Sequence, residues 1–420
     1  MATISRLHPG PGPAFAPGLA PLVLPLLLLA FAGGAAAQQR PETPPGPLGG
    51  LHLVASAGAL HDDNLFRIPD DRPAFDNQRS DWARYLIGGL LFDKAYGRQK
   101  VYLQGKVSSV KFDHFKQIDY NGKDMLGLLD WQLGNRLEGS LGASYAETLA
   151  PYTDIRTRER NLREHRRGHA DGAWRMHPQW RLRVAAARDK YSYQIPIQQV
   201  NDRTEDALEA GLDFTPRSGS TAGVVVRRVK GRYPNPRSIS GMLVNDDFTQ
   251  DELKAKVHWN VTGASSVNVL AGYARRRHEL LGQRDAKGFN GRVTASLNPR
   301  QKLRLNAAAW REFAAVESDL VSYSLNRGAS AGASWDASAK VRVDASLSSE
   351  RRRYQGGFLS ALQGQARDRL RNAALGVTWS PRSTLQLNAN YAHQRRSGAV
   401  FLGNGSFKAN TFSVSASAQF

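Results

Sequence analysis

Residues 412–420, FSVSASAQF, alternate apolar and polar side chains up to the last residue of the chain. Phe412, Val414 and Phe420 belong to the apolar set, and three serines and Gln419 form the polar set. A period of two places the two sets on opposite faces of a β-strand. Such a strand, ending in Phe, is typical of the closing strand of a membrane β-barrel. A strand of a soluble β-sandwich can alternate in the same way, so the pattern must be sought elsewhere in the chain.

The same alternation returns in other segments. Within residues 341–350, Val341, Val343, Ala345 and Leu347 alternate with polar residues, and within residues 384–393 Leu385, Leu387, Ala389 and Tyr391 do the same. We expect the apolar faces to contact lipid and the polar faces to line a lumen. The apolar faces are rich in Ala and Gly, which would fill the core of a soluble all-β protein poorly. The polar side chains predicted to form the lumen wall are Arg304, Asn306, Arg342, Asp344, Gln386, Asn388 and Asn390.

Short and long connections alternate between these segments, as periplasmic turns and outer loops do in an outer-membrane barrel. The pattern predicts an all-β, antiparallel up-and-down barrel of 18 strands, with 16 as the alternative because 51–60 and 121–133 are ambiguous. Residues of the turn-forming kinds mark the short connections. These are expected at 95–98, 133–136, 177–179, 215–219, 261–265, 297–300, 335–339 and 380–382. Tryptophans and tyrosines near strand ends suggest an interfacial girdle.

The N-terminus carries an export signal. Arg6 precedes an apolar run over residues 19–32, and Ala35-Ala36-Ala37 supplies small residues for cleavage. This arrangement is typical of a secretory signal peptide, and the run is too short to span a bilayer. We therefore expect a signal peptide at 1–37, a Pro-rich leader at 38–50 and the barrel at 51–420, placed in a bacterial outer membrane.

Composition narrows the function classes. The chain has no cysteine, which excludes disulfides and thiolate metal sites. Its net charge of +20 is compatible with a barrel whose lumen and loops are polar. Nucleic-acid binding is the other common meaning of such charge. Export from the cytoplasm argues against it, so no nucleic-acid partner is expected.

Pairs and triplets of arginine stand at the outer ends of predicted strands. Guanidinium groups bind phosphate and carboxylate in a bidentate manner. Two interpretations remain open: the arginines line the mouth and attract a polyanion, or they bind lipopolysaccharide phosphates and anchor the barrel. Consecutive residues on a strand point to opposite faces, so both can hold. The candidate contacts are Arg227, Arg228, Arg275, Arg276, Arg277, Arg351, Arg352, Arg353, Arg395 and Arg396.

Signals for catalysis are weak. Residues 328–332, GASAG, match a nucleophile-elbow pattern, but they lie within an alternating strand with no helix after them. Asp62-Asp63-Asn64 and Asn245-Asp246-Asp247 could bind calcium, although polar loop tips explain them equally simply. We expect no catalytic residues, no metal site and no cofactor, and the chain is not predicted to be an enzyme.

Residues 61–67, HDDNLFR, follow the first predicted strand. They resemble the D-[DS]-N-[LI]-[FY]-R motif that follows the opening strand of EpsL-type outer-membrane proteins. Those proteins are encoded in exopolysaccharide operons of bacteria that carry exosortase systems. The signal peptide, the chain length and the terminal Phe420 fit the same family. The resemblance implies a role in carrying extracellular polysaccharide across the outer membrane.

The sequence therefore predicts a polar, passive conduit for export or assembly of extracellular polysaccharide, since 16–18 strands leave an aqueous channel. The alternatives are a general diffusion porin, a solute-specific channel, a barrel-embedded enzyme and a structural surface protein. The expected partners are outer-membrane lipid, lipopolysaccharide, the polysaccharide, the barrel-insertion machinery, and periplasmic and inner-membrane export proteins.

Overall fold

The structure, a computed structural model, describes residues 50–155, 157–239, 242–280, 282–316, 323–355, 367–398 and 405–420. The expected signal peptide and all of the expected leader except Gly50 lie outside the described residues. Within the described ranges, the helices are too short and too polar to cross a bilayer.

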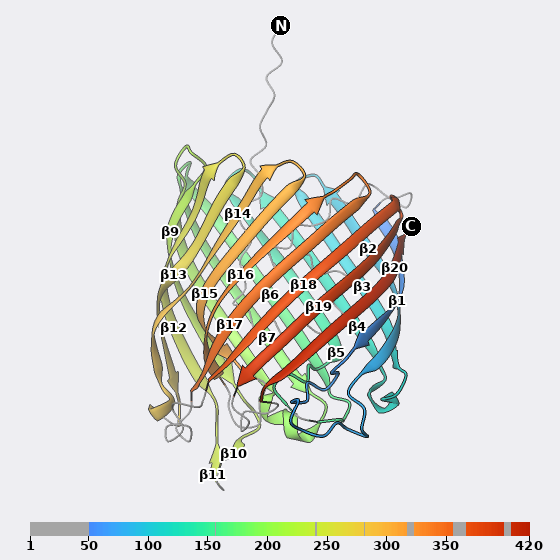
Figure 1. Ribbon diagram of the computed structural model, residues 1–420. Coiled ribbons are helices and arrows are strands. Elements are labelled where there is room, and N and C mark those ends of the chain that lie inside the picture. Colours follow the sequence, from blue (N-terminus) through green and yellow to red (C-terminus); the bar gives the residue numbers. More distant parts are fainter. Residues whose placement is uncertain are drawn as a thin grey trace.

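Eighteen antiparallel strands form one closed barrel (Figure 1). Each strand pairs with its neighbours in the chain, β9 pairs with β12, and β1 pairs with β20 to close the ring. The strands are β1 (Leu51–Asp62), β2 (Asp81–Tyr96), β3 (Gln99–Phe112), β4 (Tyr120–Leu133), β5 (Leu137–Leu149), β6 (Leu162–His177), β7 (Trp180–Tyr193), β8 (Arg203–Phe214), β9 (Thr221–Arg232), β12 (Phe248–Thr262), β13 (Ser265–His278), β14 (Ala286–Arg300), β15 (Leu303–Ala315), β16 (Tyr323–Asp336), β17 (Val341–Gln355), β18 (Arg367–Arg382), β19 (Leu385–Gly398) and β20 (Phe407–Gln419).

The count of 18 confirms the main prediction, and the two ambiguous segments are full strands, β1 and β4. The last strand runs antiparallel to the first from Val54↔Gln419 to Asp62↔Thr411. Backbone groups at both ends of the sheet are thereby paired, which is what a β-structure in lipid requires.

Side-chain direction follows the predicted alternation. On β20, Phe412 and Val414 are exposed outward, whereas the intervening serines are buried on the inner side. Leu86, Leu208 and Leu347 are likewise exposed on the outer wall. Aromatic side chains stand outward near strand ends, in the positions of an interfacial girdle, including Tyr96, Trp180, Trp259, Trp335 and Trp379. A closed barrel with an apolar outer band is an outer-membrane protein.

Both described ends of the barrel chain lie at the end of the barrel that carries the short turns (Figure 1). We assign this end to the periplasm. Two predicted turns are displaced along the chain. β14 continues to Arg300 and β18 to Arg382, each with a register shift in its last residues. Pro299 and Pro381 therefore lie in irregular strand ends, where proline is tolerated, and not in the turns themselves.

The opposite end carries the long loops and their short elements. These are the 3₁₀ helices η2 (Lys116–Ile118), η3 (Pro196–Asn201) and η4 (Gly282–Arg284), and the hairpin of β10 (Arg237–Ile239) with β11 (Met242–Val244). The largest apolar cluster of the described residues also lies here, where loops 63–80, 113–119 and 150–161 meet the strand ends. It includes Leu60, Phe66, Phe112, Phe115, Ile118 and Tyr152.

Candidate functional site

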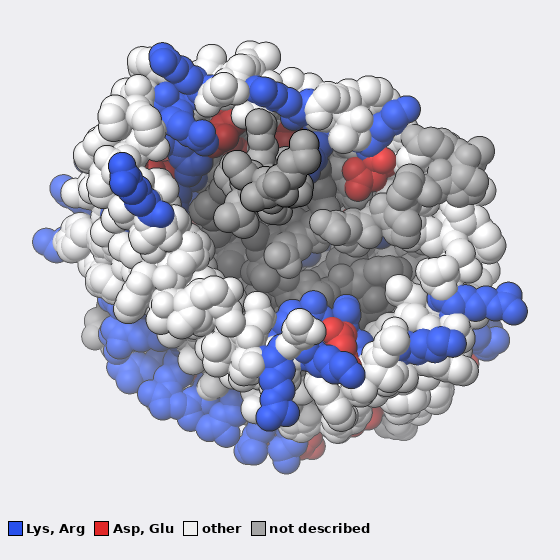
Figure 2. All heavy atoms as spheres, turned by 90° about the horizontal axis from the view of Figure 1, so that it is seen from above, with Lys and Arg blue, Asp and Glu red and all other residues white. Residues whose placement is uncertain are grey.

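The inner wall of the barrel is lined by charged side chains that are joined in pairs. On β7, Arg181 lies 2.9 Å from Glu138 of β5 and 3.1 Å from Asp213 of β8. Lys256 of β12 also reaches Asp213, at 3.3 Å. Each link spans neighbouring or next-neighbouring strands, so a band of ion pairs follows the wall. Seen from the short-turn end, the described residues form the wall of the barrel (Figure 2).

The same pairing continues around the barrel. Glu252 of β12 lies 2.8 Å from Lys254 and 3.7 Å from Arg227 of β9. Further along, Arg292 of β14 lies 2.7 Å from Glu312 of β15. The lumen is therefore strongly polar while its charges are largely compensated. Such a wall offers donors and acceptors to a hydrated solute without a dominant sign of charge.

The predicted lumen-wall residues all lie on the inner side of their strands. Arg304 and Arg342 both approach Asp336, at 3.6 Å and 2.7 Å. Asn388 accepts a hydrogen bond of 2.9 Å from Thr378. Ser334 donates to Asp344. Asn306, Gln386 and Asn390 share the same inward parity.

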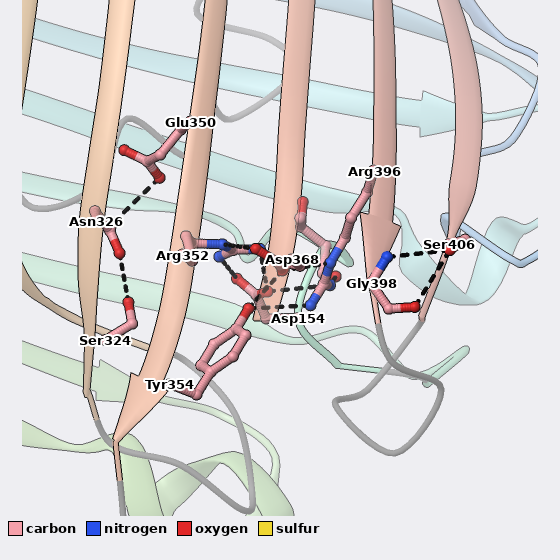
Figure 3. A network of polar contacts seen from close by, with 11 residues as sticks. Asp154, Ser324, Asn326, Glu350, Arg352, Tyr354, Asp368, Arg396, Gly398 and Ser406 are labelled. Atoms are coloured by element: carbon pink, nitrogen blue, oxygen red, sulfur yellow. Dashed lines mark hydrogen bonds and ion pairs between the residues drawn. The ribbon is translucent and has the colours of Figure 1, made fainter. Parts of the chain in front are cut away.

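The loop between β5 and β6 is fastened to the far part of the wall by a buried cluster, which we call the mouth latch: Asp154, Arg352, Tyr354, Asp368 and Arg396 (Figure 3). Arg352 of β17 donates two hydrogen bonds to Asp154, of 3.1 and 3.2 Å. Two more, of 2.9 and 2.8 Å, go to Asp368 of β18. Arg396 of β19 lies 3.2 Å from Asp154 and 2.7 Å from Asp368. Tyr354 donates to Asp368 at 2.6 Å.

The mouth latch joins distant parts of the barrel, because β20 and β1–β4 separate β5 from β19. Two residues before Asp154, Tyr152 packs against Phe66 with 4.8 Å between ring centroids. The first part of loop 150–161 is thus held by the apolar cluster at Tyr152 and by the mouth latch at Asp154. It crosses part of the extracellular mouth.

Electrostatics keeps the mouth latch ionised. Burial alone raises the pKa of Asp154, but the nearby guanidinium groups of Arg352 and Arg396 outweigh it, so the pKa lies below its ordinary value. The side chains of Arg352, Asp368 and Arg396 are almost completely buried. Two arginines and two carboxylates therefore compensate one another away from solvent.

The D-D-N-L-F-R segment forms a second fastening, over the seam between β1 and β20. Arg67 binds Asp62 through two hydrogen bonds, of 2.8 and 3.0 Å, and donates to Gln394 of β19 at 3.0 Å. Asn64 donates to the carbonyl groups of Ile68 and Lys408, both at 2.8 Å. The carboxylates of this segment are thus engaged by protein groups, which favours the loop interpretation over a calcium site.

A third fastening lies over β7–β14. Asp246 binds Arg237 at 3.0 Å and also pairs with Arg284, the last residue of η4. Arg237 donates to Asn201, at the end of η3, at 3.2 Å. All of these side chains are buried. Three arginine–carboxylate clusters therefore hold the loops of the extracellular mouth.

The structure divides the arginine runs by parity, as expected for consecutive strand residues. Arg227, Arg276, Arg352 and Arg396 point inward. Arg276 lies 3.8 Å from the Phe248 ring, and Arg352 and Arg396 belong to the mouth latch. The outward-facing members of the runs are Arg228, Arg275, Arg277, Arg351, Arg353 and Arg395.

Sequence reasoning missed Asp154 and Asp368. Asp154 stands in a polar loop with no neighbouring motif, and its partners are 198 and 242 residues away in the chain. Such a contact leaves no local signal. Among the described residues, no group of three or more His, Asp or Glu side chains is arranged to hold a metal ion. Residues 328–332 lie inside β16, without the turn that a nucleophile elbow needs.

The chain matches no protein-family model and no curated protein sequence. Among solved structures it is similar to two Pseudomonas aeruginosa proteins, OccK2 (OpdF) and OccK9 (OpdG). The identities are 12% and 14%, with TM-scores of 0.48 and 0.47. The alignments cover 88% of this chain and 97% and 98% of those chains. The siderophore receptor PirA from the same organism is similar at 10% identity and a TM-score of 0.41, covering 88% of this chain and 80% of the receptor.

Proposed function

We propose that this chain is an outer-membrane channel for hydrated, polar solutes, with an extracellular mouth restricted by fastened loops. The observation that carries the proposal is the mouth latch, which fastens Asp154 of loop 150–161 to β17–β19, two residues after Tyr152 packs into the apolar cluster. A barrel of 18 strands has room for an aqueous lumen. Fastened loops make passage depend on the size and chemistry of the solute.

Solute chemistry follows from the wall. Closely spaced, compensated donors and acceptors can replace the hydration of a sugar-like molecule without holding an ion strongly. Hydrogen bonds that are individually worth about 1 kcal/mol allow the solute to move from one site to the next. We therefore favour an uncharged or weakly charged polar solute over a strongly anionic one.

Extracellular polysaccharide is the narrower hypothesis. Its support is the resemblance of residues 61–67 to EpsL-type proteins, together with the hydrogen-bonding wall. On this hypothesis the barrel passes a polymer outward, with energy supplied by synthesis at the inner membrane. Deletion of the gene should trap polymer in the periplasm, and normal polymer outside the cell would refute the polysaccharide hypothesis while leaving the channel proposal standing.

Planar-bilayer recording tests the channel. The wild-type barrel should show low or flickering conductance. Asp154→Asn removes one carboxylate from the mouth latch at almost constant volume, so it should release the loop and raise conductance severalfold. A matched control is Asp76→Asn, because the one ion pair of Asp76 among the described residues is exposed and joins it to Arg158 of loop 150–161. Large, steady conductance in the wild type that Asp154→Asn leaves unchanged would overturn the proposal.

A further inference from the structure

A group of cations on the outer wall, which we call the outer basic patch, covers the extracellular ends of β15–β20. Its members lie directly opposite one another across neighbouring strands: Arg311↔Arg327, Arg327↔Arg351 and Arg351↔Arg369 form one row. The full set is Arg311, Arg327, Arg351, Arg353, Arg367, Arg369, Arg371, Arg395 and Lys408. In Figure 2, Lys and Arg gather on the outer wall at the lower left.

Several cations elsewhere on the outer wall have carboxylate partners. Arg188 and Arg232 share Asp206, and Arg228 and Arg277 share Asp251, at 2.5–2.7 Å. Within the described residues, the strand carboxylates that face outward are Glu147, Glu164, Asp206 and Asp251, all on β5–β12. Where the structure describes the chain, the arginines of the outer basic patch have no ion pair, and Lys408 reaches only the exposed Asp70 at 4.0 Å.

Like charges directly opposite one another on paired strands destabilise a sheet. The crowding leaves one atom without compensation: Arg311 Nη1 is buried and has no hydrogen-bond partner among the described residues. An anion bound across the row would relieve the repulsion between Arg327, Arg351 and Arg369. The same anion would also provide a hydrogen-bond acceptor near Arg311, at one end of the row.

The position of the outer basic patch along the membrane normal indicates which kind of anion it meets. On β17, the outward residues before the outer basic patch are Val341, Val343, Ala345, Leu347 and Ser349. A strand tilted by about 40° rises about 2.5 Å per residue along the membrane normal. Arg351 therefore lies about 25 Å from Val341, at the outer edge of an apolar band of ordinary thickness. The anion sits where lipid headgroups meet the outer wall.

We infer that the outer basic patch binds the phosphate groups of a phosphorylated glycolipid of the outer leaflet. Arginines in a row present several bidentate donors at the headgroup level, which suits a ligand with two phosphates and attached acyl chains. A second copy of this chain fits poorly, because the outward carboxylates of the described strands are few and already paired. The inference concerns the outer wall and does not depend on what passes through the lumen.

Native mass spectrometry of the full, delipidated protein in detergent tests this inference. The probes are bisphosphorylated lipid A, the same lipid with its phosphates removed, phosphatidylglycerol and inorganic phosphate. The test variant combines Arg327→Gln, Arg351→Gln and Arg369→Gln. We expect lipid A to bind the wild type. We expect it to bind this variant at least about tenfold more weakly, because charge-assisted hydrogen bonds are lost.

The matched control combines Arg188→Gln, Arg228→Gln and Arg277→Gln, three outer-wall arginines that already have carboxylate partners. It should bind lipid A as the wild type does. A heat-modifiable band on a gel checks that both triple variants are folded. Equal loss in the control, equal binding of the dephosphorylated lipid or of phosphatidylglycerol, or displacement of lipid A by inorganic phosphate at comparable concentration would each overturn the inference.

Discussion

Single arginines behave differently in this barrel according to the face on which they lie. Arg67, Arg352 and Arg396 are buried, and each meets a carboxylate that is buried as well. Breaking such a pair leaves an uncompensated charge away from water. Arg84 and its partner Asp113 are exposed, so water already solvates both ions. The two kinds of pair should therefore differ widely in their effect on stability.

Arg67→Gln should destabilise the barrel by about 3–5 kcal/mol, because it leaves Asp62 buried without its bidentate partner over the β1–β20 seam. Arg84→Gln, the control, should cost no more than about 1 kcal/mol. Thermal unfolding in detergent, followed by circular dichroism and by heat-modifiable gel mobility, measures both. Equal unfolding temperatures for the two variants would contradict the structural role of residues 61–67.

The mouth latch should respond to acid only at low pH. The pKa of Asp154 is lowered in the folded protein, so its stabilising contribution is complete above the ordinary Asp pKa of about 3.9. That contribution is lost as the pH falls through the lowered pKa. Conductance should therefore stay constant from pH 7 to about pH 5 and rise only below about pH 4.

Asp154→Asn provides the reference for this titration, because it lacks the ionisable group. Its conductance should already be high at pH 7 and should not rise further through loss of the Asp154 charge. A rise in wild-type conductance between pH 7 and pH 5 would assign the gating to another group.

A single strand of the barrel separates lipid from the aqueous lumen. On β17, Leu347 faces lipid, and its neighbour Ser348 faces the lumen, where it accepts a hydrogen bond from Asn372. The same strand carries Arg352 inward into the mouth latch and Arg351 outward into the outer basic patch. A period of two thus assigns opposite tasks to adjacent residues of the same type.

Leu347→Arg should destabilise the barrel by about 2–4 kcal/mol, the cost of a cation on the lipid-facing side near the bilayer midplane. Ser348→Arg, one residue along, should be tolerated because its side chain enters an aqueous, polar lumen. Urea unfolding in lipid vesicles compares the two variants. Equal destabilisation would show that the assigned inner and outer faces of β17 are wrong.

Turns were the weakest element to predict. Prolines at 299 and 381 pointed to turns at 297–300 and 380–382, but the strands continue through them with a shift in register. Proline signals only that a backbone donor is missing. A turn and an irregular strand end both tolerate a missing N–H donor. Pairing with the neighbouring strand decides which of the two forms.

For the whole molecule, the distribution of charge matters more than its sum. Inward-facing cations meet carboxylates along the lumen, whereas the outer wall of β13–β20 has no outward carboxylate among its described strand residues. The net charge of +20 therefore resides largely outside the lumen. The lumen should therefore show little preference for anions over cations, despite the basic composition of the chain.

Asp213→Asn should make the channel anion-selective, because Asp213 compensates both Arg181 and Lys256 on the inner wall. Reversal potentials under a salt gradient measure this selectivity, and the wild type should lie near zero. Asp206→Asn is the control, since Asp206 pairs with Arg188 and Arg232 on the outer wall. Strong anion selectivity in the wild type would contradict the compensated lumen.

The sequence by itself determined the barrel, its 18 strands, and the inner and outer face of each strand that alternates regularly. Alternation and turn-forming residues are local properties, so they can be recognised in the linear sequence. Tertiary structure alone decided how the mouth is restricted and where the charge lies. Asp154 meets Arg352 and Arg396 only when the ring closes and brings distant loops and strand ends together. Whether a cation is compensated depends equally on the neighbouring strand, which no local pattern specifies.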